Sequence, residues 1–383
     1  MLKPPQSPMK NSGVTDLPLH GGKAPWWLLS RMKGLAKEIV SVIVDEYGQK
    51  ELVRRISDPY WFQALSCALA FDWHSSGTTT VLCGVLKSVM DPQEHGVGVA
   101  GGKGRHAADA PGDIASLCGS FGLSSAKTDS LLHCSRIAGK VDSAALQDGY
   151  DIYHHCMVLD EKGNWTVVQQ GLNTERRYAR RYQWTDNAES LTISPHSGIT
   201  GTRERDVLDL TAQKSADTQK AITDLVKEDP TKVRRMFVDT RKPGQTGLES
   251  WMDVSGQGAT DMIVLPEKVN WGAIRAAYEW QPSNFEEVLE IRGMGAKTLR
   301  GLSLVSELVY GSSPSWEDPV RYSFAYGGKD GVPYPVEREA MDESIRFLKD
   351  AVSASKGGDK EKIDAFRRLE SYASRIKSRN TTL

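Results

Sequence analysis

Apolar residues recur at helical spacing in several stretches, and each stretch predicts an amphipathic helix. After Pro25, one broad apolar face contains Trp27, Leu28, Met32, Leu35, Ile39, Val42 and Ile43. Similar spacing predicts a helix that starts near Thr78, and further helices near 113–140, 337–352 and 359–378. From about residue 200 onward the pattern is mainly helical.

A second pattern predicts strands in the first half of the chain. Segments 150–159 and 164–170 are rich in β-forming residues and flank the polar turn 160–163, as in a β-hairpin. A short Val-Gly-Val strand precedes a glycine-rich loop within 93–113. The expected class is α+β. We expect a tail at 1–16, a mixed α/β domain at 17–200, a helical region at 201–310, and a small C-terminal module at 311–383 with an extended opening segment and helices.

Segment 285–310 contains two apolar helical faces separated by a tight Gly-x-Gly turn. Ser283 or Asn284 can cap the first helix. The segment resembles the helix-hairpin-helix motif of DNA repair and recombination proteins, which holds the phosphates of one DNA strand. The resemblance implies DNA contacts from Gly293, Gly295, Lys297 and Arg300, since glycine allows a backbone to approach an oxyanion closely. An ordinary αα-hairpin with a glycine turn is the alternative.

Composition limits how nucleic acid could be bound. The 383 residues carry a formal net charge of −1, so DNA contact must come from local patches. Hydrophobic content of 39% and charged content of 25% describe a soluble globular protein without an apolar run of membrane-spanning length. The Pro- and Ser-rich N-terminus reads as a loose tail and not as a signal peptide.

The five cysteines are widely spaced, and none forms a C-x-x-C pair. We therefore expect buried thiols in a reducing cytoplasm, and neither a zinc knuckle nor a disulfide framework.

The motif DWHSSGTTT at 72–80 places an acid and a histidine before an apparent helix start. Hydroxyl residues at a helix N-terminus can bind phosphate, and the candidates are Ser75, Ser76 and Thr78. Asp72 and His74 are candidate metal ligands or a general base beside that phosphate. The alternative is an N-cap cluster with a structural His74. The motif is not a Walker A loop, because it has no Gly-Lys-Ser/Thr order.

A second phosphate-binding candidate is the loop that contains Gly102, Lys103, Gly104 and Arg105. Its sequence GGKGRHAA is similar to the phosphate loop of ParB-like proteins, although a lone glycine-rich loop is a weak signal. A flexible surface loop is the alternative.

Two adjacent histidines face two adjacent glutamines across the expected hairpin. Alternation sends His154 and His155 to opposite faces, so at most one of them belongs to a given site. Pairing should bring a histidine near Gln169 or Gln170, and buried polar groups of this kind need partners. We interpret these four residues as catalytic candidates.

The run ERRYARRYQW at 175–184 interleaves arginines with aromatic residues. If it is helical, its arginines form a cationic face that could bind phosphates while the aromatics stack on bases. The DNA-binding candidates are Arg176, Arg177, Arg180 and Arg181. The alternative is a solvated face paired with acidic neighbours.

Taken together, long motifs between about 17 and 350 resemble a prokaryotic family known only as a domain of unknown function, number 763. They include LHGGKAPWWLLSRMKGLAKEI, FDWHSSGTTT, YHHCMVLDEKGNWTVVQQGLN, IRGMGAKTLRGLSLVSELVYG and YSFAYGGKDGVPYPV. The family pattern has histidine where this chain has Gln183, so the resemblance assigns that position no catalytic role. The family name implies no reaction.

The leading hypothesis is a DNA-binding protein of repair or recombination type that acts as a metal-dependent nuclease or a related phosphodiester-processing enzyme, with Mg²⁺ or Mn²⁺ as cofactor. The absence of a paired-carboxylate signature weighs against it. One alternative is a non-catalytic DNA-binding module that recruits partners. Another is a nucleotide-binding enzyme that uses the glycine-rich loop. The oligomeric state is not predicted.

Overall fold

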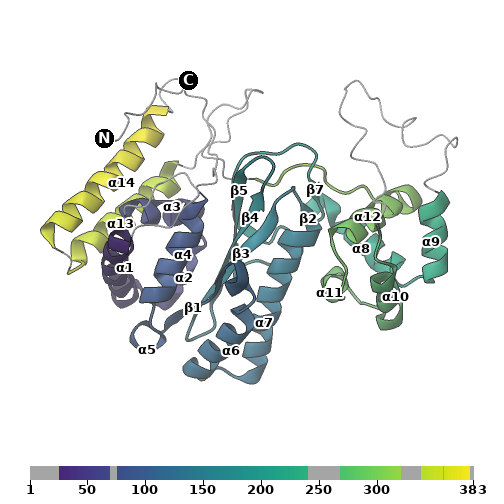
Figure 1. Ribbon diagram of the computed structural model, residues 1–383, viewed down its shortest axis with the longest axis horizontal. Coiled ribbons are helices and arrows are strands. Elements are labelled where there is room, and N and C mark those ends of the chain that lie inside the picture. The colour runs from purple at the N-terminus through teal and green to yellow at the C-terminus, as the bar shows by residue number, and fades with distance from the viewer. Residues whose placement is uncertain (1–25, 70–75, 240–267, 321–337, 357, 380–383) are drawn as a thin grey trace.

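Helices from both ends of the sequence form one layer of the molecule (Figure 1). The computed structural model describes residues 26–69, 76–239, 268–320, 338–356 and 358–379. The layer consists of α1 (Trp26–Tyr47), α2 (Gln49–Ile56), α3 (Pro59–Ala68), α4 (Gly77–Val89), α13 (Arg338–Ala354) and α14 (Asp359–Arg379). Asp58 starts α3 by accepting the N–H groups of Tyr60 and Trp61, with Pro59 in the first turn.

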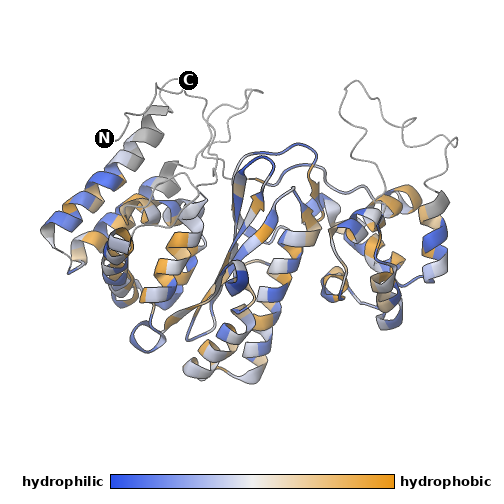
Figure 2. Ribbon diagram, viewed as in Figure 1, coloured by the Kyte–Doolittle hydropathy of each residue, from blue (hydrophilic) through white to orange (hydrophobic). Residues whose placement is uncertain are grey.

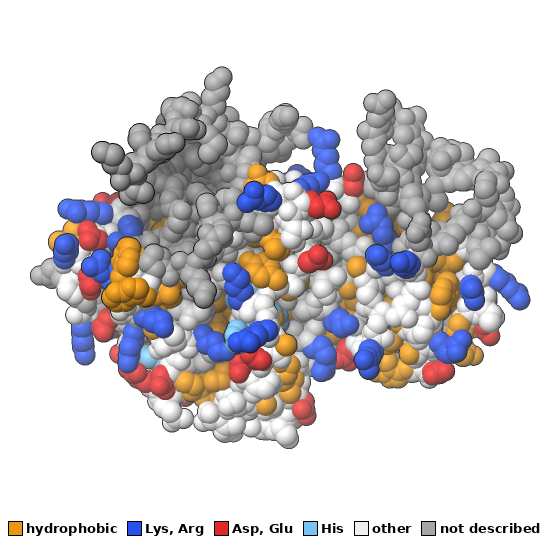
Figure 3. Space-filling model, viewed as in Figure 1, with side chains coloured by type: hydrophobic (Ala, Val, Ile, Leu, Met, Phe, Trp, Pro, Cys, Tyr) orange, Lys and Arg blue, Asp and Glu red, His pale blue; other side chains and the backbone are white. Residues whose placement is uncertain are grey.

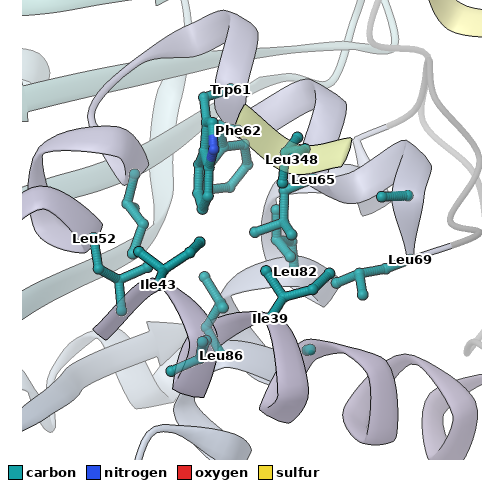
Figure 4. Close-up of a cluster of buried hydrophobic side chains, with 14 of the residues drawn as sticks. Ile39, Ile43, Leu52, Trp61, Phe62, Leu65, Leu69, Leu82, Leu86 and Leu348 are labelled. Atoms are coloured by element: carbon teal, nitrogen blue, oxygen red, sulfur yellow. The ribbon is translucent and has the colours of Figure 1, made fainter. Parts of the chain in front are cut away.

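A first apolar core holds this layer together (Figure 4). Ile39, Ile43 and Leu52 meet Trp61 and Phe62 from α3, and Leu348 of α13 joins them. Leu82, Val85 and Leu86 of α4 are buried in the same core, and the ribbon of α4 is partly orange in Figure 2. Of the apolar face predicted after Pro25, Met32, Leu35, Ile39 and Ile43 are buried, whereas Trp27 is 50% exposed.

The centre is an antiparallel sheet with strand order β1-β3-β4-β5-β6. Its strands are β1 (Val97–Lys103), β3 (Asp151–Asp160), β4 (Trp165–Asn173), β5 (Tyr178–Thr185) and β6 (His196–Thr200). Helices α2, α3 and α4 cover one face, which we call the N-layer face. Helices α6 (Ala110–Phe121) and α7 (Ser125–Lys140) cover the other, which we call the α7 face. Because both faces are covered, many polar residues in the middle of the strands are buried, whereas Lys103 at the end of β1 is exposed.

Short elements connect these parts: α5 (Pro92–His95), η1 (Gly104–Ala107), η2 (Val141–Ala145) and η3 (Gln213–Ser215), with a small second sheet of β2 (Leu146–Gln147) and β7 (Leu208–Asp209).

Further helices extend the α7 side: α8 (Ala216–Leu225), α9 (Pro230–Asp239), α10 (Trp271–Trp280), α11 (Phe285–Glu290) and α12 (Ala296–Tyr310). They share a second apolar core with α6, α7 and the α7 face of the sheet. Asn284 caps α11 at the Glu287 N–H, and Glu287 accepts the Ser283 N–H in return.

The structure confirms the α+β class, the β3–β4 hairpin and the helices predicted after Pro25, from near Thr78, and near 113–140, 337–352 and 359–378. The helix considered for the arginine run at 175–184 is not confirmed. All five cysteines are free thiols, and Cys134 is the one among them that is not fully buried. In the described parts of the chain, no helix is both long enough and apolar enough to cross a bilayer. The predicted domain boundaries stay a prediction.

Candidate functional site

The histidine–glutamine prediction locates a polar site inside the sheet. His154 pairs in register with Gln170, and His155 pairs with Gln169. His154 and Gln170 lie on the N-layer face, whereas His155 and Gln169 lie on the α7 face, as alternation predicted. Each face of the sheet therefore holds one His–Gln pair.

On the N-layer face, one polar row runs across all five strands of the sheet. Successive partners in register are Lys103, His154, Gln170, Arg181 and Thr200. Lys103 is exposed, and the other four are at most 1% exposed. This cross-strand row brings together four predicted site residues from three different motifs.

Several polar atoms beside this row have no hydrogen-bond partner within the described residues. They are the Gln170 Oε1 atom, the Thr200 hydroxyl and the hydroxyl of Thr79 on α4. An unpartnered buried polar atom costs about 1–3 kcal/mol, so such a group marks a place for a ligand, an ion or water. The Gln170 Nε2 atom donates to the Ser76 carbonyl at 2.8 Å and to the Tyr153 hydroxyl at 2.5 Å, which ties the start of α4 to the row.

A cluster that could hold a metal ion adjoins the row. The sulfur atoms of Cys83 and Cys156 and a ring nitrogen of His154 all lie within 4.8 Å of one another, and all three residues are buried. The hydrogen bond from Cys83, together with contact with His154, holds the pKa of Cys156 well below the usual thiol value. Burial raises the pKa of Cys83.

On the α7 face, the other histidine belongs to a fully connected network. Gln169 Nε2 donates to the Ala138 carbonyl at 3.1 Å and to Asp142 at 2.5 Å, so its Oε1 faces His155. His155 Nδ1 must donate to that oxygen at 2.9 Å, and Nε2 accepts from the Ser135 hydroxyl at 2.8 Å. Burial lowers the pKa of His155, which favours this neutral tautomer.

Asp142 also orients a histidine that borders a cavity. Its second oxygen lies 2.5 Å from His196 Nε2. His196 lines a cavity of about 330 Å³ together with Asp209, Thr211 and Ser315. Burial raises the pKa of Asp209. A carboxylate-oriented imidazole at a cavity wall is an arrangement suited to proton transfer.

Sequence reasoning missed Asp142, His196, Cys83 and Cys156. The sequence contained one signal of the metal-binding cluster: His154 and Cys156 are two residues apart on a strand, so their side chains share a face. Cys83 and Asp142 gave no local signal, because their partners lie far away in sequence.

The DWHSSGTTT motif is only partly described. Asp72, His74 and Ser75 lie outside the described residues. Ser76 precedes α4 without a side-chain capping bond, and Thr78 is fully buried in its first turn.

The glycine-rich loop forms the end of β1 and η1. Gly102 and Gly104 have positive φ angles of 155° and 60°. Lys103 and Arg105 are exposed, and the Lys103 ammonium lies 5.8 Å from the Tyr153 ring centre. The loop therefore presents cations beside the outer end of the cross-strand row.

The arginine run is a turn at Arg176 and Arg177 followed by the strand β5 from Tyr178, so the helical expectation for it was wrong. Alternation places Arg180 and Arg181 on opposite faces of β5, and both are fully buried. Arg180 is paired with Asp148 at 2.8 Å and Asp318 at 2.6 Å. Arg176 is paired with Glu204, and Arg177 is exposed. These side chains form no shared cationic face.

The Gly-x-Gly turn joins α11 to α12 as predicted. Gly293 has a φ of 87°, and a Cβ there would lie 2.5 Å from Asn270 Nδ2. Gly295 is different, because a Cβ there would meet nothing within 4 Å. Lys297 is exposed, whereas the Arg300 guanidinium lies 5.2 Å from the Trp316 ring centre.

The fold and the site define an α+β protein whose antiparallel sheet carries buried polar groups on both faces. The chain belongs to the family described as "Protein of unknown function (DUF763)", whose model matches residues 13–336. This confirms the resemblance seen in the sequence motifs. No curated protein and no solved structure matches the chain.

Proposed function

We propose that the protein binds the backbone of DNA through the α11–α12 turn and processes phosphodiester bonds. The observation that carries the proposal is Gly295. Its φ of −112° and the open space around it mean that the fold itself does not require glycine there. A missing side chain that folding does not explain suits close approach by a phosphate.

The surroundings of Gly295 support this interpretation. It is the N-cap of α12 and has no side chain that could cap the helix. Its carbonyl accepts the N–H groups of Thr298 and Leu299, which leaves those of Ala296 and Lys297 without an intrahelical acceptor. Arg292 and Lys297, on either side of the turn, are exposed. Lysines and arginines elsewhere on the face seen in Figure 3 are dispersed among acidic and apolar side chains, so local contact must supply the affinity.

Phosphodiester chemistry would be carried out at the cross-strand row. His154 supplies an imidazole, Gln170 an amide, and Lys103 and Arg105 exposed cations at the row's outer end. The Mg²⁺ or Mn²⁺ expected for a nuclease prefers oxygen ligands. Asp72 and His74 remain the proposed ligands for such an ion.

The binding half of the proposal is tested by Gly295→Val, Lys297→Ala and Arg292→Ala. Each should weaken DNA binding at low salt, and each lysine or arginine change should lower the salt slope by about 1. Lys220→Ala, an exposed lysine of α8 paired with Asp217, is the matched control. Fluorescence anisotropy with labelled duplex and junction DNA measures both quantities. Equal binding by all four variants would rule out the turn as the contact.

The catalytic half is tested separately with end-labelled DNA and Mg²⁺ or Mn²⁺. We expect cleavage that His154→Gln reduces while binding is retained. Salt-dependent binding without cleavage by the wild-type chain would instead identify a non-catalytic DNA-binding module.

A further inference from the structure

We infer that Cys83, His154 and Cys156 bind one thiophilic divalent cation of the zinc class. The donors come from two elements that are distant in sequence. His154 and Cys156 point to the same side of β3, and α4 brings Cys83 against them. The inference does not depend on nucleic-acid binding.

The strongest observation is the contrast between two neighbouring histidines. His155 has both ring nitrogens satisfied, by Ser135 and Gln169. His154 is 1% exposed, yet neither of its ring nitrogens has a nitrogen or oxygen partner among the described residues. Its close neighbours are two sulfur atoms. A core histidine normally finds nitrogen or oxygen partners, whereas the ring of His154 meets two sulfur atoms, an arrangement that suits a shared metal ion.

The donor set selects the metal. Two thiols and an imidazole favour zinc and related soft cations over Mg²⁺ or Mn²⁺. Zinc bonds of about 2.3 Å to sulfur and about 2.0 Å to nitrogen put tetrahedral ligand atoms roughly 3.5–3.8 Å apart. The observed limit of 4.8 Å is within a small side-chain adjustment of that spacing.

Three protein ligands leave one coordination position to fill. Two residues adjacent to the ligands in the fold carry an unpartnered buried oxygen: Thr79 lies one helical turn before Cys83, and Gln170 pairs in register with His154. Such oxygens can hold a metal-bound water in place. Three protein ligands with a fourth position for water are typical of catalytic zinc, whereas structural sites have four.

The test is the metal content of the purified full-length chain, measured by mass spectrometry of the elements. We expect about one zinc per chain, reduced at least about tenfold by Cys83→Ser, Cys156→Ser or His154→Gln. The matched controls are Cys118→Ser, a buried thiol of α6, and His155→Gln, on the opposite face of β3. Both should keep the metal. Cobalt substitution should add a sulfur-to-cobalt absorption band that the first three variants lack.

A second measurement applies if the ligand variants fail to fold. A strong chelator added to the wild-type chain should free two further thiols for reaction with a thiol reagent. A metal-free chain that does not take up zinc would overturn the proposal. So would a disulfide between Cys83 and Cys156, or zinc retained in all three variants.

Discussion

His155 shows how one buried residue depends on a single protonation state. Its Nδ1 donates to Gln169, and its Nε2 accepts from Ser135. A protonated ring would require the Ser135 hydroxyl to turn from donor to acceptor and would place a positive charge in the core. Burial accordingly lowers the pKa of His155.

This predicts a pH dependence of stability. The unfolded chain protonates His155 as the pH falls through about 6.5, whereas the folded chain resists protonation, so acidification favours unfolding. Urea unfolding at about pH 7.5 and about pH 5.5 should show a larger loss of unfolding free energy for the wild type than for His155→Gln. Parallel losses would mean that the folded protein does not hold His155 neutral.

At the scale of elements, the α11–α12 unit depends on a contact with α10. The Asn270 side chain caps α10 at the Ala273 N–H and also donates to the Gly293 carbonyl at 3.2 Å. Gly293 combines a left-handed φ with the approach of this same amide. One asparagine thus fixes both a helix start and the glycine turn.

Gly293→Ala should therefore cost about 1–3 kcal/mol of unfolding free energy through backbone strain and displacement of Asn270. Gly295→Ala is the matched control and should cost less, no more than about 1 kcal/mol, because alanine there is only a poorer N-cap without backbone strain. Thermal or urea unfolding followed by circular dichroism measures both. Equal costs at the two glycines would contradict the structural difference between them.

Local patterns predicted elements well and the site only in part. Helices such as α1 and the β3–β4 hairpin follow from the period of apolar residues and from turn chemistry, which act over a few residues. The strand β5 was missed, because Arg180 is satisfied by Asp148 and Asp318, which lie 32 and 138 positions away. The alternation of side chains along a strand correctly predicted that His154 and His155 point to opposite faces of the sheet. No local pattern could predict that Cys83 lies beside Cys156, because α4 and β3 come together only in the tertiary fold.

At the scale of the whole molecule, the first core is built from both ends of the chain. Leu348 of α13 and Leu369 of α14 are fully buried in the same cluster as Ile39 of α1 and Phe62 of α3. The last two helices are thus part of the N-terminal layer. The sheet's N-layer face is complete only when this layer is complete.

Leu348→Ala should cost about 2–5 kcal/mol, and truncation after residue 337 should abolish cooperative unfolding of the N-terminal layer. Thermal melting together with size-exclusion chromatography tests both variants. The control is Ile363→Ala, which changes α14 at a side chain that is 48% exposed and so leaves the core intact. It should have little effect on melting. A truncated chain that melts as sharply as the full chain would show that the layer folds without them.

The order of synthesis adds a consequence to this shared core. Its contributors before α13 end with Val168 in β4, and Leu369 emerges 201 residues later (369 minus 168). At about 5–20 residues per second, this interval lasts roughly 10–40 s. During that time the nascent chain exposes the apolar sides of α1 and α3 without their final partners. A chaperone that recognises apolar helices would find its substrate in this window, and in the finished protein it would not.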